Sequence, residues 1–238
     1  MSRRIVPTDI RFGIMPRFRC IIGFELFAMQ SNSWSTGTIG ATILALISPR
    51  STRRRISTNV NVLFTFHYYD PFAFTGQGLA WLLDGRYRYL TGVTWPYNAA
   101  NAQASLNNAL GLVNQDPNLT SGQRAAFENE LSSDIANYAM NGTPKYLTTQ
   151  FAKVQLWARE HRITPSQILV GEYGVAQPDH NTLGDPLPTS PAWFSALHAV
   201  VARMGFAAAV WDLDSGFGIT CGEPGVATLC AAYEGVFP

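Results

Sequence analysis

The chain has 238 residues, 17 of them lysine or arginine and 16 aspartate or glutamate, so its formal net charge is only +1. Hydrophobic residues make up 47% and charged residues 14%, which is enough apolar sequence for one large folded domain and too little charge for a disordered chain. The near-neutral balance argues against a nucleic-acid binder, and three cysteines exclude a small disulfide-built fold. The apolar run from Ile39 to Ile47 is much shorter than the roughly 20 residues that a membrane span needs.

Charge is distributed unevenly along the chain. Residues 1–56 carry nine arginines and two acidic side chains, a net charge of +7, and the remaining residues carry eight basic and fourteen acidic side chains, a net charge of −6. Arg53–Arg55 has no aromatic residues among its charges, so residues 1–56 are expected to be either a solvated surface or a stretch unrelated to the natural fold. Met1–Arg4 is not followed by the apolar core of a secretory signal.

The first expected element is a strand at residues 61–66 (NVLFTF), a short β-branched and aromatic run typical of a buried strand. Pro71 ends this strand and begins a loop that continues to Trp95–Tyr97. Three helices are expected next, because apolar residues recur at helical spacing on one face of each. They cover residues 102–113, 121–140 and 144–162.

A second buried strand is predicted at residues 168–174, where it ends in a glycine-rich turn. Ser190 and Pro191 then begin a helix as its N-cap and first-turn residue, and Gly205 ends it. A third strand at 206–213 and a short helix at 227–233 complete the chain. This alternation of helices with apolar strands that lack a two-residue period predicts an α/β fold with a parallel sheet buried on both faces.

Chemically informative side chains lie where these strands end. The first strand delivers His67 and Tyr69, the second Glu172 and the third Trp211. In open α/β sheets and in barrels, functional groups gather at the carboxyl ends of the strands. A glutamate there can be a nucleophile or a base, and a phenol can donate a hydrogen bond to it. Aromatic faces match the C–H surface of a pyranose ring, so the four residues together indicate a carbohydrate site.

Three motifs in this order resemble glycoside hydrolase family 5, the cellulase and endoglucanase family. Residues 66–78 (FHYYDPFAFTGQG) resemble its strand-six region, residues 169–175 (LVGEYGV) its strand seven, and residues 211–218 (WDLDSGFG) the end of its strand eight. The resemblance covers about residues 57–238, the second half of a (β/α)8 TIM barrel. It implies an incomplete barrel in which strands five to eight are present and strands one to four are absent or replaced. Residues 1–56 would then hold strand five together with non-native or rearranged sequence.

The resemblance also implies the roles of the site residues. Glu172 would be the catalytic nucleophile, Tyr69 would hydrogen-bond its carboxylate, and His67 would contact the sugar or the catalytic carboxylates. Enzymes of the family retain the anomeric configuration and use two carboxylates about 5 Å apart. Trp211 would stack beneath the sugar ring. Further substrate contacts are expected at Trp34, Gln77 and Trp95.

This chain departs from the family pattern in two places. Related sequences usually have histidine where this chain has Gly76, a departure that concerns the local contacts of the flanking Thr75 and Gln77. The family's acid/base glutamate lies in an Asn-Glu-Pro motif after strand four, and no Asn-Glu-Pro occurs in this chain. The proton donor is therefore expected to be missing.

Residues 18–34 resemble the family in two alternative alignments. In the first, residues 19–23 are strand five and residues 32–34 its terminal loop, and the distance to His67 favours this alignment. In the second, Phe24–Leu26 resembles the run that precedes the acid/base residue, but Ala28–Gln30 then stands in place of Asn-Glu-Pro. Neither alignment supplies the proton donor.

The leading functional hypothesis is a retaining hydrolase of β-1,4-glucan, with cellulose, mannan and xyloglucan all open as substrates. Loss of the acid would limit its activity, because a positioned general acid contributes about 10²–10⁴-fold. The alternatives are a non-catalytic carbohydrate-binding remnant and a half barrel that self-associates through exposed sheet edges. The expected partner is a polysaccharide or oligosaccharide, and neither nucleic acid nor a membrane is expected.

Cofactor, metal and compartment complete the sequence-based expectations. No cofactor is expected, and no metal site, because the four histidines are scattered without ligand spacing. The resemblance implies a secreted or periplasmic protein, although this chain shows no signal peptide. Cys221 and Cys230 would form either a small disulfide, in keeping with export, or two reduced thiols.

Overall fold

The computed structural model of the chain describes residues 63–177, 188–213, 216–221 and 228–237. Several sequence-based predictions fall outside the described residues. They are the arginine-rich segment 1–56, the strand at 19–23, both alignments of residues 18–34, and the substrate contact expected at Trp34. The division of the chain near residue 57 therefore stays a prediction.

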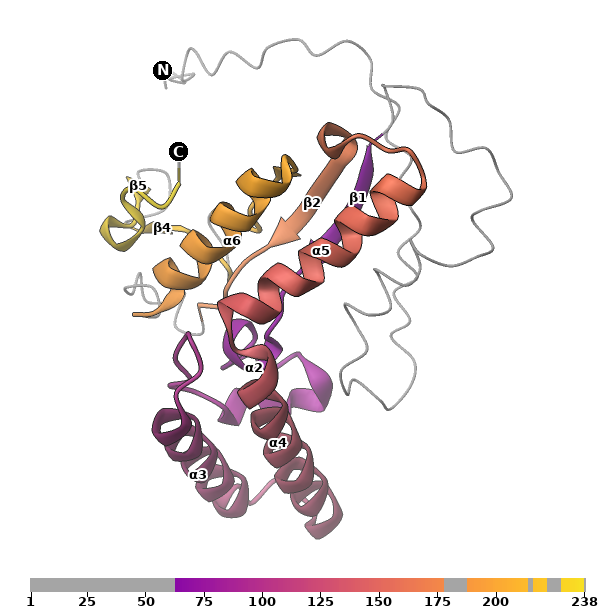
Figure 1. Cartoon of the computed structure of the whole chain (residues 1–238). Coiled ribbons are helices and arrows are strands. Elements are labelled where there is room, and N and C mark those ends of the chain that lie inside the picture. Colours follow the sequence, from indigo (N-terminus) through magenta and orange to yellow (C-terminus); the bar gives the residue numbers. More distant parts are fainter. Residues whose placement is uncertain (1–62, 178–187, 214–215, 222–227, 238) are drawn as a thin grey trace, which may run out of the picture.

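Three parallel strands form the sheet that carries the candidate site. β1 (Phe64–Tyr68), β2 (Ile168–Tyr173) and β3 (Ala207–Ala208) lie in the order β1-β2-β3, and both pairings are parallel. Helices α5 (Pro144–Glu160) and α6 (Ser190–Met204) lie across the same face of this sheet (Figure 1). The predicted α/β class with parallel strands is confirmed for the described residues. Closure into an eight-stranded barrel is not part of the described structure and stays a prediction.

Aromatic side chains of α5 and α6 pack against one face of the sheet. Phe66 of β1 packs edge-on against Phe151 of α5, and Tyr173 of β2 packs edge-on against Phe194 of α6. All four side chains are buried. Because successive residues of a strand point to opposite faces, His67 points away from these helices. The face opposite α5 and α6 therefore carries the polar residues of the strand ends.

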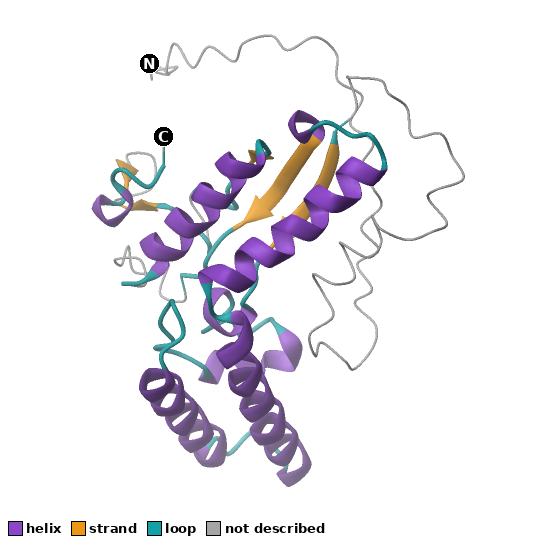
Figure 2. Ribbon diagram, viewed as in Figure 1, coloured by secondary structure: helices purple, strands orange, loops and turns teal. Residues whose placement is uncertain are grey.

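Helices α3 (Ala99–Gln115) and α4 (Ser121–Asn141) form a pair beside the sheet, joined to it through α5 (Figure 2). Helices α3, α4 and α5 each begin at a capping side chain: Asn98 accepts from the backbone of α3, Thr120 forms a capping box with Gln123 in α4, and Thr143 caps α5. The helix at 102–113 was predicted three residues too short at its start, because the cap formed by Asn98 lies outside the apolar pattern.

The third strand is shorter than predicted. The expected strand at 206–213 is regular only at β3, yet the chain continues alongside β2: the Ala209 N–H donates to the Val170 carbonyl at 2.9 Å, and the Trp211 N–H to the Tyr173 carbonyl at 2.8 Å. The backbone therefore still delivers Trp211 to the end of β2, although the ladder is irregular.

The predicted helix at 227–233 is wrong. β4 (Thr220–Cys221) pairs antiparallel with β5 (Thr228–Leu229), and a disulfide joins Cys221 to Cys230. Only a 3-10 turn, Ala231–Tyr233, follows. The disulfide holds this segment against β4, so residues 228–230 are extended rather than helical. The sequence left open whether Cys221 and Cys230 are disulfide-bonded or reduced, and in the structure they are disulfide-bonded.

Short elements fill the remaining connections. They are α2 (Phe72–Thr75) directly after β1, a kinked 3-10 segment at Leu83–Tyr89, and a 3-10 turn at Pro165–Gln167 before β2. Gly205 ends α6 in the left-handed conformation, with φ of 72°, as its sequence position predicts. Within the described ranges, no helix combines the length and apolar character that crossing a bilayer would require.

Candidate active site

Glu172, His67 and Tyr69 meet where β1 and β2 end. Parallel pairing sets His67 directly beside Glu172 in the register of the two strands. The register of the two strands shifts between Phe66 and His67, and as a result the side chains of His67 and Glu172 lie together. Gly171 makes room for the approach, because a Cβ there would lie 3.3 Å from the His67 ring and would collide with the Thr65 hydroxyl.

The Glu172 carboxylate is held by two donors on one oxygen. The Tyr69 hydroxyl donates to Oε2 of Glu172 at 3.0 Å, and Nδ1 of His67 lies 3.1 Å from the same atom. An ionised carboxylate only accepts hydrogen bonds, so Nδ1 of His67 carries the proton in this contact. The side chains of His67 and Glu172 are 25% and 29% exposed, which leaves the carboxylate accessible to solvent. Its other oxygen, Oε1, has no hydrogen-bond donor among the described residues.

The ring of Tyr69 is fixed by aromatic neighbours from both sides of the site. It packs edge-on against Phe217, with ring centroids 5.6 Å apart, and against Phe72 at 6.5 Å. Phe217 is buried and belongs to the segment after β3. The tyrosine hydroxyl is therefore aimed at Glu172 by packing as well as by its hydrogen bond.

Trp211 lies next to the end of β2 and is 47% exposed. Its backbone N–H donates to the carbonyl of Tyr173, the residue after Glu172. Gly174 permits this close approach, since a Cβ at that position would overlap the Trp211 carbonyl oxygen. The indole is thus held by its backbone at the same strand ends as Glu172, while its side chain stays open to a ligand.

Two predicted substrate contacts are corrected by burial. Gln77 is completely buried, and its amide donates to the carbonyls of Phe74 and Val93 and accepts from the Val93 N–H, each at 2.9 Å. Trp95 is 2% exposed and packs against Phe74. Both side chains hold the long loop after β1 together and are closed to a sugar.

The glycine at position 76 is explained by its neighbours. A Cβ there would lie 2.8 Å from the Phe72 ring and 3.0 Å from Leu82, so these side chains occupy the space that a histidine would need. Thr75 and Gln77 keep well-defined contacts with the backbone on either side of it. Glycine at position 76 therefore fits the packing of this loop.

Sequence reasoning missed Trp81. It lies in the loop after β1 and, at 68% exposure, is the most exposed of the large hydrophobic side chains in the described part of the chain. Its neighbours Leu79, Ala80, Leu82 and Leu83 are apolar, so the local sequence favours burial of Trp81 and gives no signal for its exposure. As for metals, the described residues contain no group of three or more His, Cys, Asp or Glu side chains placed to hold an ion.

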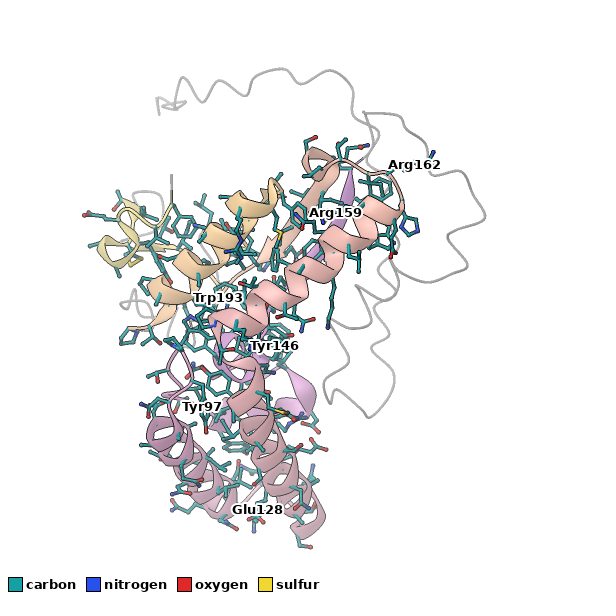
Figure 3. The ribbon with its side chains drawn as sticks, viewed as in Figure 1. Tyr97, Glu128, Tyr146, Arg159, Arg162 and Trp193 are labelled. Carbon is teal, nitrogen blue, oxygen red and sulfur yellow. A yellow bond between two sulfur atoms is a disulfide. The ribbon has the colours of Figure 1, made fainter. Side chains whose placement is uncertain are left out.

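Asp70, the residue after Tyr69, lies on the helix side of the strand end. Its carboxylate accepts a hydrogen bond from the Tyr146 hydroxyl at 3.4 Å, and its backbone carbonyl accepts from the Trp193 indole at 3.1 Å. Figure 3 shows Tyr146 at the start of α5 and Trp193 on α6. Burial raises the pKa of Asp70 from 3.8 to about 6, against the opposing effects of the Tyr146 hydrogen bond and the Lys153 charge.

This raised pKa predicts a pH-dependent stability. Between about pH 4 and pH 6 the folded chain keeps a proton on Asp70 that the unfolded chain releases, so stability falls as pH rises through this window. Asp70→Asn cannot ionise, so its free energy of unfolding should exceed that of the wild type by about 3 kcal/mol at neutral pH, at 1.36 kcal/mol per pKa unit. The two should be equal near pH 3.5. Urea unfolding at both pH values measures the difference, and parallel pH profiles would contradict the assignment.

The strand ends thus define a class of site: a solvent-accessible carboxylate, held on one oxygen by a histidine and a phenol, beside an exposed indole. No protein-family model matches this chain. Endoglucanase 3 from Fibrobacter succinogenes is 25% identical to it over 122 residues, which make up 51% of this chain and 16% of that protein.

Solved structures similar to this chain are also endoglucanases or related proteins. Cellulose synthase subunit Z (CcsZ) from Clostridioides difficile matches with 21% identity and a TM-score of 0.46, over 76% of this chain and 42% of that one. Endoglucanase Cel5A from Thermotoga maritima matches with 18% identity and a TM-score of 0.49, over 81% of this chain and 44% of that one. The chain spans less than half the length of each of these three proteins. The sequence match to Endoglucanase 3 supports the resemblance to endoglucanases over about half of this chain.

Proposed function

We propose that this chain carries the nucleophile side of a retaining β-glycosidase site, with Glu172 as the nucleophile and a β-1,4-glucan as the substrate class. The observation that carries the proposal is the contact of His67 and Tyr69 with one oxygen of Glu172, on the accessible face of the strand ends. A carboxylate fixed in this way presents its other oxygen in one direction, as attack on an anomeric carbon requires.

In the first step, Oε1 of Glu172 attacks the anomeric carbon and the bond to the leaving oxygen breaks. Oε2 becomes the carbonyl oxygen of the resulting glycosyl ester, and it continues to accept from His67 and Tyr69. In the second step, water attacks the same carbon from the opposite face, the ester bond breaks, the proton of the water passes to solvent and the Glu172 carboxylate is released. The two inversions together retain the anomeric configuration.

Trp211 would form the floor for the sugar in this proposal. Its indole is exposed and its backbone is tied to Tyr173, so the ring is held near Glu172 without being covered. Replacing Trp211 with alanine should weaken retardation in a glucan-containing gel by about tenfold or more, because stacked aromatic contacts concentrate binding energy. Leu213→Ala is the matched control, since Leu213 is also exposed and lies on the same segment. Equal retardation of both variants would count against the indole as a sugar platform.

The departing oxygen of a natural glucan needs a proton, and the sequence has no Asn-Glu-Pro motif to provide the family's acid. We therefore expect the chain to react with glycosides whose leaving group is a weak base and needs no proton. We expect it to act poorly on a polysaccharide. A 2,4-dinitrophenyl β-cellobioside should release dinitrophenolate, whereas a soluble β-glucan should be cleaved more slowly by a factor within the general-acid range of about 10²–10⁴. Rapid cleavage of both would show that the chain has a proton donor.

A carbohydrate-binding protein without catalysis is the second candidate, and the exposed Trp211 beside the strand ends favours it. Two measurements, retardation in a glucan gel and release of dinitrophenolate, distinguish the binding protein from the enzyme. Glucan-gel retardation without release of dinitrophenolate supports binding alone, and release that Glu172→Gln abolishes supports the enzyme. We further propose an exported protein, because the Cys221–Cys230 disulfide persists in oxidising compartments.

A further inference from the structure

Thr75 is a buried polar residue that reaches back to the strand carrying Tyr69. It is the last residue of α2 and is fully shielded from solvent. Its hydroxyl donates to the backbone carbonyl of Tyr69 and also lies 3.4 Å from the carbonyl of Pro71. A buried hydroxyl that donates to a carbonyl fixes the position of that peptide, since breaking the bond leaves both groups without a partner.

The backbone of Thr75 makes a second connection, to the other strand of the site. Its carbonyl accepts from the N–H of Ala176 at 2.7 Å, and Ala176 is four residues beyond Glu172 and fully buried. One residue therefore bridges the segment after β1 and the segment after β2. Tyr69 lies in the first of these segments and Glu172 in the strand just before the second, and their side chains meet at 3.0 Å.

We propose that Thr75 is a positioning residue: its hydroxyl fixes the Tyr69 peptide, and through Tyr69 it sets the orientation of the Glu172 carboxylate. This inference rests on the proposed function of Glu172. Thr75 itself is closed to solvent and touches no substrate. Its effect reaches the reaction through one hydrogen bond to a backbone carbonyl and one from the Tyr69 hydroxyl to Oε2.

Two substitutions isolate the hydroxyl. Thr75→Val removes the donor and keeps the side-chain shape and the backbone bond to Ala176, whereas Thr75→Ser keeps the donor. The probe is 2,4-dinitrophenyl 2-deoxy-2-fluoro-β-cellobioside, which esterifies a carboxylate nucleophile and releases dinitrophenolate. The rate constant of inactivation should fall about 10- to 100-fold in Thr75→Val and stay within about threefold in Thr75→Ser, with the inhibition constant unchanged in both.

A double substitution at Thr75 and Tyr69 distinguishes a positioning role of Thr75 from a general loss of stability. Partial unfolding lowers the fraction of protein that becomes labelled, whereas misplacement of Tyr69 lowers the rate constant at full final labelling. If Thr75 acts through Tyr69, then Thr75→Val has no further effect on the rate in a Tyr69→Phe background. Additive effects of the two substitutions, or equal rates in wild type and Thr75→Val, would overturn the inference.

A fluorine NMR measurement makes the result independent of the proposed reaction. Incorporating 3-fluorotyrosine labels all nine tyrosines, and the resonance missing in Tyr69→Phe identifies Tyr69. This resonance should move or broaden in Thr75→Val and stay in place in Thr75→Ser. If the wild type is not labelled by the fluorosugar, the proposed function fails. The fluorine resonance still decides whether Thr75 positions Tyr69, and an unmoved resonance rejects it.

Discussion

Glu172→Ala is expected to lose at least about a thousandfold of the wild-type activity on an activated β-cellobioside, and azide is expected to restore the reaction with a changed product. Removal of a residue that forms the covalent intermediate costs this much or more in other enzymes. Alanine leaves room below the sugar where the carboxylate stood, so azide can attack the anomeric carbon directly. A single inversion then gives the α-glycosyl azide, while the leaving group departs as dinitrophenolate without protonation.

The anomer of the product is the informative measurement, and proton NMR of the isolated azide gives it. Glu160→Ala is the matched control, because Glu160 is an exposed carboxylate at the end of α5. This control should keep wild-type activity and gain nothing from azide. A β-configured product from Glu172→Ala, or azide rescue equally strong in the control, would place the nucleophile elsewhere.

Gly174→Ala is expected to destabilise the fold by about 3 kcal/mol, the upper part of the range for forcing an added methyl group into a packed site. The added Cβ would overlap the backbone carbonyl oxygen of Trp211 and would lie 3.2 Å from the Phe217 ring. A backbone oxygen cannot rotate away as a flexible side chain can. The segment after β3 would have to shift, and it carries both Trp211 and the Phe217 ring that packs on Tyr69.

Gly111→Ala, also a glycine-to-alanine substitution, is expected to stabilise the fold instead. No heavy atom would lie within 4 Å of its Cβ, and the residue lies inside α3. Alanine is a better helix former than glycine, so this variant should gain about 0.5–1 kcal/mol. Urea unfolding of the two variants at one pH measures both effects. A Gly174→Ala variant as stable as the wild type would show that β2 and the segment after β3 are not packed as closely as described.

The grouping of His67, Tyr69 and Glu172 could be predicted because its geometry follows from local sequence. His67 and Tyr69 have the two-residue spacing of one strand face, and Glu172 ends the next strand of the sheet. Parallel strands that end at the same edge bring such residues together without further information. The structure adds the detail that both donors share one oxygen, which depends on the register shift at His67 and on Gly171.

The loop contacts could not be predicted in the same way. Gln77 and Trp95 stand beside family-like motifs and are polar or aromatic, so the sequence favoured substrate contact. Their burial depends on packing against distant residues: the Gln77 side chain bonds to the backbone of Val93, and the backbone N–H of Trp95 donates to the Thr189 hydroxyl at 2.9 Å. Such pairings are set by the tertiary fold, which no local pattern encodes.

The C-terminal segment shows the same limit. The alanine-rich composition of residues 227–233 favours a helix, whereas the disulfide to Cys221 and the β4–β5 pairing favour an extended chain. The covalent constraint and the β4–β5 pairing together outweigh a helix propensity of a few tenths of a kcal/mol per residue. The sequence left the pairing of Cys221 and Cys230 open, and that pairing decides the local structure.

Identification of the side chain that a fluorosugar esterifies tests the central claim most directly. Wild-type protein incubated with 2,4-dinitrophenyl 2-deoxy-2-fluoro-β-cellobioside and digested with a protease at low pH should give one peptide heavier by a single fluorocellobiosyl group, with fragmentation placing it on Glu172. Esterification of a different carboxylate, or no modification of protein that is folded by circular dichroism, would contradict the assignment of Glu172 as the nucleophile.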